Sequence, residues 1–509
     1  MSSNNKILLI APKLFKGWDY QRNFHEISPP LGLLSIGTVL HEEGFEVKII
    51  DASISEDYLK DIENYLLKKP LYAGISAMTS QVSSGIDIAE YIRKMSPNTL
   101  LVWGGIHATL FPQQTCSDPL ADLVVIGEGE YSCLELTKSL RQSHQIPSLP
   151  GLGYKKDGKF LLNLQNELAD INKFPFPYFD LLPMDSYLTR DFGGTRFFFG
   201  EQQKSIILHT GVGCPYDCTF CINNSLAQSL KRYRGKTADR ILDEIDMVIN
   251  KYQVRHIVFR DDNFLLDKKR FIRFLDGLEE RRYKITWYCT ARADFFHEGY
   301  LSETLVQRMA NLGCARISIG VESGSEKIIN LLKKGINLNQ VRHAATLCKR
   351  YGIIIAYSFM MGLPGEEPED TLKTLNFIGK LVRFNPKDFI LGPQIFRPYP
   401  GSALYQECIN KGFTPPDSLR EWANNDLEDT SGYLGLNRFP WLKKPKFYFY
   451  INFAFKKGIL RSYRELPLRS WWLKAIFESR KKLNLWSFLF EVKIAGVLSQ
   501  IKERMLSLK

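Results

Sequence analysis

Residues 211–221 read GVGCPYDCTFC and place three cysteines, Cys214, Cys218 and Cys221, at a Cys-x3-Cys-x2-Cys spacing. Three thiolates at this spacing can each bind one iron of a cubane cluster, whereas an ordinary electron-transfer [4Fe–4S] centre takes four cysteines. The neighbouring sequence supplies no fourth cysteine. The stretch therefore predicts an iron–sulfur cluster with these three cysteines as metal ligands and one iron left open to a further ligand.

Two other interpretations of the three cysteines stay open: a structural zinc site and a chance cluster. Structural zinc usually takes four ligands, often as paired Cys-x2-Cys. His209 is a candidate fourth ligand, but it lies five residues upstream on an expected strand. The remaining cysteines do not form the dense pattern of a disulfide scaffold. They lie singly along the chain at Cys116, Cys133, Cys289, Cys314, Cys348 and Cys408.

The cysteine segment directly follows an expected strand, and strands alternate with helices from there onward. Within 201–400, strands are expected at 205–209, 256–260, 286–290, 316–321, 353–361 and 389–393. Six such units predict a partial, open (β/α)6 barrel similar to a TIM barrel, because a closed barrel of eight units takes about 250 residues. The active sites of such barrels lie at the carboxyl ends of the strands. The three cysteines directly follow the carboxyl end of the first strand.

Residues 1–145 show a second alternation of strands and helices. Strands are expected at 6–10, 46–51, 71–75, 99–103 and 123–126. The alternation predicts a doubly wound, Rossmann-like parallel sheet, so the fold class is α/β. Ligands of such sheets lie beyond the carboxyl ends of the strands. Residues 146–200 are richer in Pro and Gly and are expected to form a linker.

Residues 401–509 lose the alternation and are expected to form a mainly helical, basic and aromatic region. The formal net charge of the chain is +12, and basic runs such as 443–446 are either solvated faces or a docking surface. No signal peptide is visible, and no uncharged apolar stretch reaches the ~18 residues that span a membrane. We expect a cytoplasmic protein without a nucleic-acid partner. Its tail either covers the barrel mouth or contacts a membrane peripherally.

The Cys-x3-Cys-x-aromatic-Cys pattern after the first barrel strand resembles the radical S-adenosylmethionine (SAM) superfamily. The resemblance implies that the open iron chelates SAM, which is cleaved to a 5′-deoxyadenosyl radical. Similar turns follow the next four strands, at 259–264, 290–292, 319–324 and 361–366. Helix capping by Asp262 or Ser323 and a surface ion pair of Arg292 are the structural alternatives. By resemblance, the SAM contacts are Phe220, Asp262, Arg292, Glu322, Ser323 and Gly362.

A parallel-sheet domain ahead of such a barrel resembles the cobalamin-binding radical SAM enzymes. The motifs that carry this resemblance are SPPLGL at 28–33, GGIHAT at 104–109 and IGEGE at 126–130. The loop after the first strand lacks the Gly-x-Gly-x-x-Gly of a dinucleotide site, which argues against NAD. The cobalamin contacts implied are Ser76, Met78, Thr79, Gln81, Gly104, Gly105, His107, Gly127 and Glu128.

One cobalamin motif is missing from the sequence. The Asp-x-His-x-x-Gly pattern, whose histidine ligates cobalt from below, does not occur. His107 lies instead in Gly-Gly-x-His, where it is either a cofactor contact or a hydrogen-bonded loop residue. We therefore expect cobalamin with its base displaced, no histidine on cobalt, and the lower face of the corrin against residues 76–81.

The resemblance implies methyl transfer to an unactivated carbon of a small-molecule or natural-product substrate. One SAM would methylate Co(I), and a second would yield the radical that removes hydrogen from the substrate before the methyl is added. An electron donor such as flavodoxin or ferredoxin is implied. No acid–base residue is obligatory, and none is assigned as catalytic. The alternatives are oxidative cyclisation, rearrangement or hydroxylation, radical SAM chemistry with an empty first domain, and a non-catalytic corrinoid-binding protein.

Overall fold

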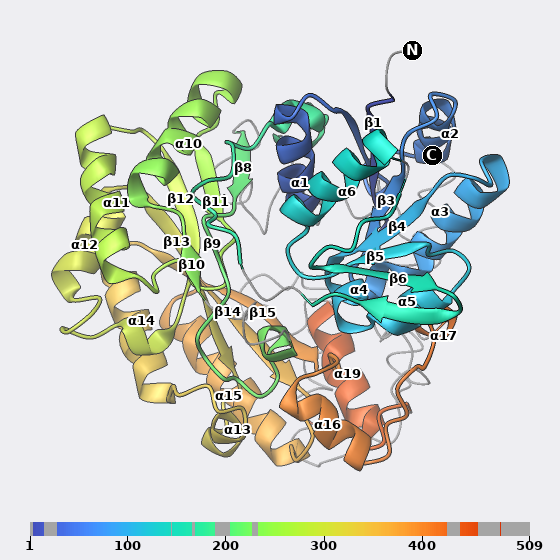
Figure 1. The fold of residues 1–509 in the computed structure, drawn as a ribbon. Helices are drawn as coiled ribbons and strands as arrows, with labels where there is room; N and C mark the ends of the chain where they lie inside the picture. Colours follow the sequence, from blue (N-terminus) through green and yellow to red (C-terminus); the bar gives the residue numbers. More distant parts are fainter. Residues whose placement is uncertain are drawn as a thin grey trace, which may run out of the picture.

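The computed structural model describes residues 4–14, 28–143, 145–164, 168–188, 204–225, 233–424, 438–456 and 479. Two α/β halves lie side by side, the first in blue and cyan and the second in green to orange (Figure 1). Each half is built on its own sheet. This arrangement confirms the predicted α/β class with a Rossmann-like sheet followed by a partial barrel.

A seven-stranded sheet forms the core of the first half. Its order is β2-β1-β3-β4-β5-β6-β7, and the first five strands pair in parallel. The strand order reverses at β1, because β2 and β3 pair with its opposite edges, and such a reversal opens a ligand crevice at the carboxyl ends. The strands are β1 (Lys6–Ala11), β2 (Glu46–Asp51), β3 (Ala73–Ser76), β4 (Leu101–Gly104), β5 (Leu123–Val125), β6 (Leu152–Lys156) and β7 (Lys159–Leu162).

Helices cover the apolar strands of this sheet. β1 reads KILLIA and is buried from Ile7 to Ala11, as expected of a strand covered on both faces. Helix α1 packs beside α6, and α2 packs beside α3. The helices are α1 (Leu31–Glu42), α2 (Tyr58–Leu66), α3 (Val82–Met95), α4 (Gly105–Leu110), α5 (Pro112–Ser117) and α6 (Gly129–Ser143).

Part of the segment expected as a linker belongs to the first sheet. Strands β6 and β7 form an antiparallel hairpin, and β6 pairs with β5. The hairpin turns at Asp157 and Gly158, which both have positive φ (51° and 74°). An Asp-Gly pair in this conformation is the favoured two-residue hairpin turn. The first sheet therefore continues to residue 162, beyond the boundary expected at 145.

A six-stranded parallel sheet forms the second half, in the sequential order β15-β14-β13-β12-β11-β8. The edge strands β8 and β15 do not pair, so the barrel is open, as predicted. The strands are β8 (Ser205–Leu208), β11 (His256–Phe259), β12 (Thr286–Ala291), β13 (Cys314–Glu322), β14 (Ile354–Met361) and β15 (Phe389–Ile395). The long helices between them are α10 (Ala238–Tyr252), α11 (Lys268–Arg281), α12 (Glu303–Asn311), α14 (Leu338–Arg350) and α15 (Pro368–Phe384).

The described part of the C-terminal region is helical and touches both halves. Helix α17 (Leu419–Asn424) packs on α3, and α19 (Pro445–Lys456) packs on β15; α16 (Ala403–Asn410) precedes them. The basic run at 480–482 and most of the aromatic tail lie outside the described residues. Among the described helices, none has the length and apolar character needed to cross a membrane.

Candidate cofactor site

The three cysteines lie on the loop that follows β8 and the short strand β9 (Gly211–Val212). Backbone hydrogen bonds fix this loop: Thr219 donates to Leu332 O at 3.0 Å, and Leu404 donates to Thr219 O at 3.0 Å. Cys218 is buried, and the other two cysteines are partly exposed. The loop is therefore anchored to the C-terminal end of helix α13 (Glu326–Leu331) and to α16, at the carboxyl end of the barrel.

The thiols lie close enough to influence one another. The pKa of Cys221 is raised to about 11, mainly by burial and in smaller part by Cys218, Asp262 and Cys214. Burial also raises the pKa of Cys214, with Asp262 and Cys218 adding to the effect. The thiols of Cys214 and Cys221 would therefore have to lose their protons when a metal binds, and formation of metal–thiolate bonds releases such protons.

The three thiols of the cysteine loop are a donor set that suits a cubane cluster. Among the residues that the structure describes, no three His, Cys, Asp or Glu side chains converge to hold one ion. A tetrahedral zinc site needs such convergence. In a cubane each thiolate binds a different iron, so three sulfurs spread over one loop are suitable.

Two adjacent aspartates follow β11 and have different roles. Asp261 is buried and accepts hydrogen bonds from the backbone N–H and the hydroxyl of Thr210, at 2.7 and 2.6 Å. Asp262 is exposed and accepts from Asn223 Nδ2 at 3.0 Å. The structure thus places Asp262, the residue predicted to contact SAM, beside the cysteine loop, while Asp261 holds the strands together.

Arg292 also lies against the cysteine loop, but its guanidinium already has partners. It stacks on the ring of Tyr216 with 3.6 Å from Cζ to the ring centroid. It pairs with Asp294 at 2.9 Å and donates to Lys334 O at 2.5 Å. Its contact with a SAM carboxylate stays a prediction, and the structure shows it supporting the loop that carries the cluster ligands.

Glu322 ends β13 in a strained conformation beside a lysine that sequence reasoning missed. Its φ is +68°, a conformation that side chains other than glycine rarely adopt. Lys334 Nζ donates to Glu322 Oε1 at 2.5 Å, and both side chains are largely buried. The same ammonium lies 5.7 Å from the ring centroid of Phe220. The structure therefore brings Phe220, Glu322 and Lys334 together next to the cysteines.

Two of the predicted SAM contacts do not face open space. Ser323 is fully buried; its hydroxyl lies 3.0 Å from that of Thr374 and accepts from Ser325 N at 3.1 Å, whereas the N-cap of the following helix α13 is Ser325. Gly362 is covered by the C-terminal region, since Trp441 Nε1 donates to its carbonyl at 2.8 Å. A Cβ at Gly362 would lie 3.1 Å from Leu442. The C-terminal region therefore fills the space beside Gly362 from which SAM is expected to approach this glycine.

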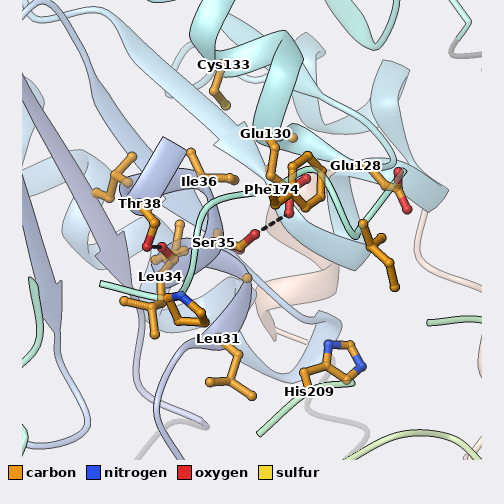
Figure 2. A pocket seen from close by; sticks show the side chains of 18 of the residues that line it. Leu31, Leu34, Ser35, Ile36, Thr38, Glu128, Glu130, Cys133, Phe174 and His209 are labelled. Carbon is orange, nitrogen blue, oxygen red and sulfur yellow. Dashed lines mark hydrogen bonds between the residues drawn. The ribbon is translucent and has the colours of Figure 1, made fainter. Parts of the chain in front are cut away.

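A cavity of about 330 Å³ lies at the carboxyl edge of the first sheet and extends to the barrel. Its walls come from α1, the first turn of α6, residues 171–179 and the end of β8 (Figure 2). Five of the nine predicted cobalamin contacts line it: Ser76, Gly104, Gly105, Gly127 and Glu128. The glycine at 105 is required, because its φ is +85° and a Cβ there would lie 2.8 Å from Ala77 O.

The other four predicted contacts, Met78, Thr79, Gln81 and His107, do not line this cavity. Gln81 donates to Pro12 O at 2.8 Å and accepts from Met78 N at 2.9 Å, so it braces the loop after β3. Met78 is 44% exposed at the tip of that loop. Gln81 thus supports the loop rather than presenting itself to a ligand.

His107 is buried behind the loop rather than facing a ligand. It is 0% exposed, and its Nδ1 lies 3.3 Å from Thr79 Oγ1. The ring of Trp422, from the C-terminal region, lies edge-on with centroids 5.7 Å apart. Burial lowers the pKa of His107 to about 3, so the imidazole is neutral. The structure therefore places His107 in the core, and both its contact with the cofactor and the absence of a histidine on cobalt stay predictions.

Glu128 joins the two halves of the protein. Its carboxylate pairs with Arg234 on the short strand β10 (Arg234–Gly235) and accepts from Ala169 N at 3.3 Å. Arg240 of α10 adds to the same junction by donating to Phe174 O at 2.6 Å. The Glu128 side chain, which is predicted to contact cobalamin, therefore links the two halves of the protein beside the cavity.

The position of His107 gives a spectroscopic prediction. In protein loaded with cobalamin and reduced to Co(II), we expect an electron paramagnetic resonance spectrum without nitrogen superhyperfine splitting. The His107→Ala variant should give the same spectrum, because the imidazole cannot leave the core without unfolding the loop. A nitrogen pattern that disappears in His107→Ala would contradict this expectation.

The cysteine loop, the strand-end residues and the open sheet define a radical SAM barrel preceded by a Rossmann-like ligand domain. Family models for the B12 binding domain and the radical SAM superfamily match residues 18–137 and 208–378. An uncharacterized methyltransferase of Pyrococcus horikoshii is 31% identical over 428 residues, 83% of this chain and 87% of that protein. The chain therefore belongs to the cobalamin-binding radical SAM enzymes. Its cofactors are a [4Fe–4S] cluster, SAM and cobalamin.

Two further relatives mark the breadth of this family. The anaerobic magnesium-protoporphyrin IX monomethyl ester cyclase of Rubrivivax gelatinosus is 25% identical over 395 residues, 75% of this chain and 67% of the cyclase. The solved structure of the cobalamin-dependent SAM radical enzyme OxsB, with aqua-cobalamin and SAM bound, aligns with a TM-score of 0.65 at 20% identity. That alignment covers 79% of this chain and 60% of OxsB, and it shows the shared fold.

Proposed function

We propose that this protein transfers a methyl group from SAM, by way of cobalamin, to an unactivated carbon of a small-molecule substrate. The observation that carries the proposal is the cavity shared by the two halves. It is lined by the strand ends of the first sheet and by Leu208, His209 and Gly211. These last residues immediately precede Cys214, so the cobalamin domain presents its ligand edge to the loop that carries the cluster.

The chain's own residues position and shield the cofactors. When bound, the cluster with SAM supplies a radical that removes hydrogen, and cobalamin supplies the methyl group. Cys214, Cys218 and Cys221 would hold the cluster, with Phe220 on the same loop and Asp262 and Glu322 at the adjacent strand ends. Trp441 packs on the turn after β14 and α19 packs on β15, where they would help to exclude water and so protect reactive species.

The relatives favour methyl transfer over cyclisation. The methyltransferase of Pyrococcus horikoshii matches at higher identity and over more of its own length than the cyclase of Rubrivivax gelatinosus does. Oxidative cyclisation with the same cofactors is the second candidate function, and the cyclase relative supports it.

A labelling experiment separates the two functions. Anaerobically reconstituted protein is incubated with reductant, cobalamin, candidate metabolites and SAM whose methyl group carries deuterium. We expect 5′-deoxyadenosine, S-adenosylhomocysteine and a product that has gained one deuterated methyl group. Formation of 5′-deoxyadenosine with an unlabelled product that has lost hydrogen would favour cyclisation. If no 5′-deoxyadenosine forms with any substrate or without one, the proposal fails.

The reductant of the cluster is an acidic one-electron carrier such as flavodoxin or ferredoxin. The net charge of +12 supports this part of the proposal, because complementary charge speeds the encounter of redox partners. The encounter rate should fall steeply with added salt. The segment around residues 444–457, for which peripheral membrane contact is predicted, falls largely within α19, which packs on β15. Its contact with a membrane stays a prediction.

A further inference from the structure

Two polar side chains, His209 and Arg260, lie next to each other at the carboxyl ends of β8 and β11. These strands pair in parallel up to Leu208 opposite Phe259. Arg260 N also donates to Leu208 O at 2.9 Å, so the ladder continues by one residue and brings His209 beside Arg260. Neighbouring strands lie about 4.8 Å apart, which places both side chains within reach of one ligand.

Both side chains face the inside of the barrel. The residues that follow them, Thr210 and Asp261, bond to each other through the Thr210 hydroxyl at 2.6 Å. Asp261 also pairs with Arg270 of helix α11 at 3.6 Å, so this pair lies on the side of the sheet that the helices cover. Successive side chains of a strand point to opposite faces. His209 and Arg260 therefore point inward.

The protein itself engages neither side chain. Both are exposed. Within the part of the chain that the structure describes, the His209 imidazole and the Arg260 guanidinium make no hydrogen bond, ion pair or ring contact. The nearest acid along the chain, Asp262, accepts instead from Asn223 Nδ2 at 3.0 Å. The guanidinium is thus a charged group with all its donors open at the barrel mouth.

The interior of the barrel has a positive character. The six strands contain a single acidic residue, Glu322, and its carboxylate is already paired with Lys334. Arg316 of β13 lies between two rings, with its Cζ 4.7 Å from the centroid of Tyr288 and 5.1 Å from that of Phe389. An anion entering the barrel would therefore meet guanidinium groups and no free strand carboxylate.

The pair lies between the two cofactor regions. His209 lines the cavity at the first sheet, and Figure 2 shows its imidazole without a hydrogen bond to the other residues drawn. On the other side, Arg260 is two residues from Asp262, whose partner Asn223 follows Cys221 of the cluster loop. A group held by His209 and Arg260 would thus lie between the cobalamin domain and the cluster.

We propose that Arg260 and His209 bind an anionic group of the substrate, a carboxylate or a phosphate, and so orient the substrate between the two cofactors. The inference rests on the proposed function and names the class of its substrate. A guanidinium is a planar fork that binds either group through two parallel hydrogen bonds, and the imidazole can donate a third. Fixing one end of the substrate holds the reacting carbon in place.

The test measures protection of Arg260 from phenylglyoxal, which modifies accessible guanidinium groups, in the anaerobically reconstituted full-length protein. The probes are benzoate, phenyl phosphate and the neutral benzamide, and mass spectrometry of peptides follows each arginine. We expect benzoate or phenyl phosphate, at about ten times its dissociation constant, to slow modification of Arg260 about tenfold. Benzamide should give no protection, because it lacks the charge that the guanidinium pairs with.

Arg255 is an internal control in the same samples. It is exposed and, among the described residues, its side chain has no partner either, but it lies at the amino end of β11. Its modification rate should not respond to any of the three probes. Slowing of Arg255 to the same degree as Arg260 would show unspecific binding of anions to arginine and would overturn the inference.

Two variants examine the roles of the pair. His209→Ala should raise the concentration of the more strongly protecting anion that gives half-protection by about fivefold, the effect of one hydrogen bond. Arg260→Met removes the charge and keeps the length of the side chain. Its equilibrium affinity for SAM should stay within about twofold of the parent protein, because the site is assigned to the substrate and not to SAM.

The remaining outcomes are distinguishable. Stronger protection by benzoate would identify a carboxylate on the substrate and stronger protection by phenyl phosphate a phosphate, and both results support the inference. Protection by neither anion, or equal protection by benzamide, would overturn it. A loss of SAM affinity of about tenfold or more in Arg260→Met would assign this arginine to SAM and would overturn it as well. These results leave methyl transfer itself to the labelling experiment, which fails or succeeds independently.

Discussion

Replacement of Cys218 by alanine should abolish the cluster and, with it, reductive cleavage of SAM. Cys218 is the buried member of the three loop cysteines, and an iron without its thiolate leaves the cubane open to loss. Substitutions that only affect the surroundings of metal ligands typically cost 10- to 100-fold, so we expect the cleavage rate to fall by more than about 100-fold. Iron content and the formation of 5′-deoxyadenosine measure this loss. Cys214→Ala and Cys221→Ala should behave alike.

The chain offers a matched control for these variants. Cys348 is fully buried in α14, away from the loop, and its thiol serves only as packing. Cys348→Ala should retain the iron content and the SAM-cleavage rate of the parent protein. If Cys218→Ala kept its cluster, or if Cys348→Ala lost it, the assignment of the three ligands would be wrong.

Replacement of Glu322 by glutamine should weaken SAM binding and destabilise the barrel together. The pair with Lys334 is largely buried, and breaking a buried pair leaves one charge without compensation, at a cost of about 3–5 kcal/mol. We expect the free energy of unfolding to fall by about 3 kcal/mol. SAM affinity should fall at least tenfold, since Glu322 is predicted to bond the ribose or the amine of SAM. Denaturant titration and equilibrium SAM binding measure the two effects.

A double variant separates the structural effect from the functional one. Glu322→Gln combined with Lys334→Met removes both charges, so most of the lost stability should return, while SAM affinity stays low. The exposed pair of Glu303 with Arg350 is a control; Glu303→Gln should change neither quantity measurably. Parent-like SAM binding by the double variant would show that Glu322 supports the fold only.

Much of the fold could be predicted because its signals are local. The apolar strand at 6–10 and the later alternation of strands with helices follow from short-range periodicity. The three cysteines share one loop, so their spacing alone predicts them as ligands of the cluster. The Asp157-Gly158 hairpin was also visible as a turn signal, but the Pro- and Gly-rich surroundings favoured a linker, and the added strands were missed.

The same distinction between local and long-range signals applies to the predicted cofactor contacts. The strand-end glycines, such as Gly104 and Gly105, line the cavity as expected, because parallel strands bring their carboxyl ends to one edge. Ser323, Gly362 and His107 are packed against other parts of the protein, and their contacts with the cofactors stay predictions. Ser323 contacts Thr374, more than 50 positions further along the sequence, and Gly362 and His107 contact Trp441 and Trp422 of the C-terminal region. No local sequence pattern reveals such long-range contacts.

The sequence by itself determined the two parallel sheets and the family, and it predicted the cysteines that would bind the cluster, because ligand spacing and strand periodicity are properties of short segments. The tertiary structure decided which polar side chains pair with one another inside the protein and, therefore, which ones remain available to contact the cofactors. The pairs Glu322–Lys334, Glu128–Arg234 and Ser35–Glu130 join residues 12 to 106 positions apart. A buried charge or hydroxyl must find a partner when water is removed, and only the packed chain determines which partner is within reach.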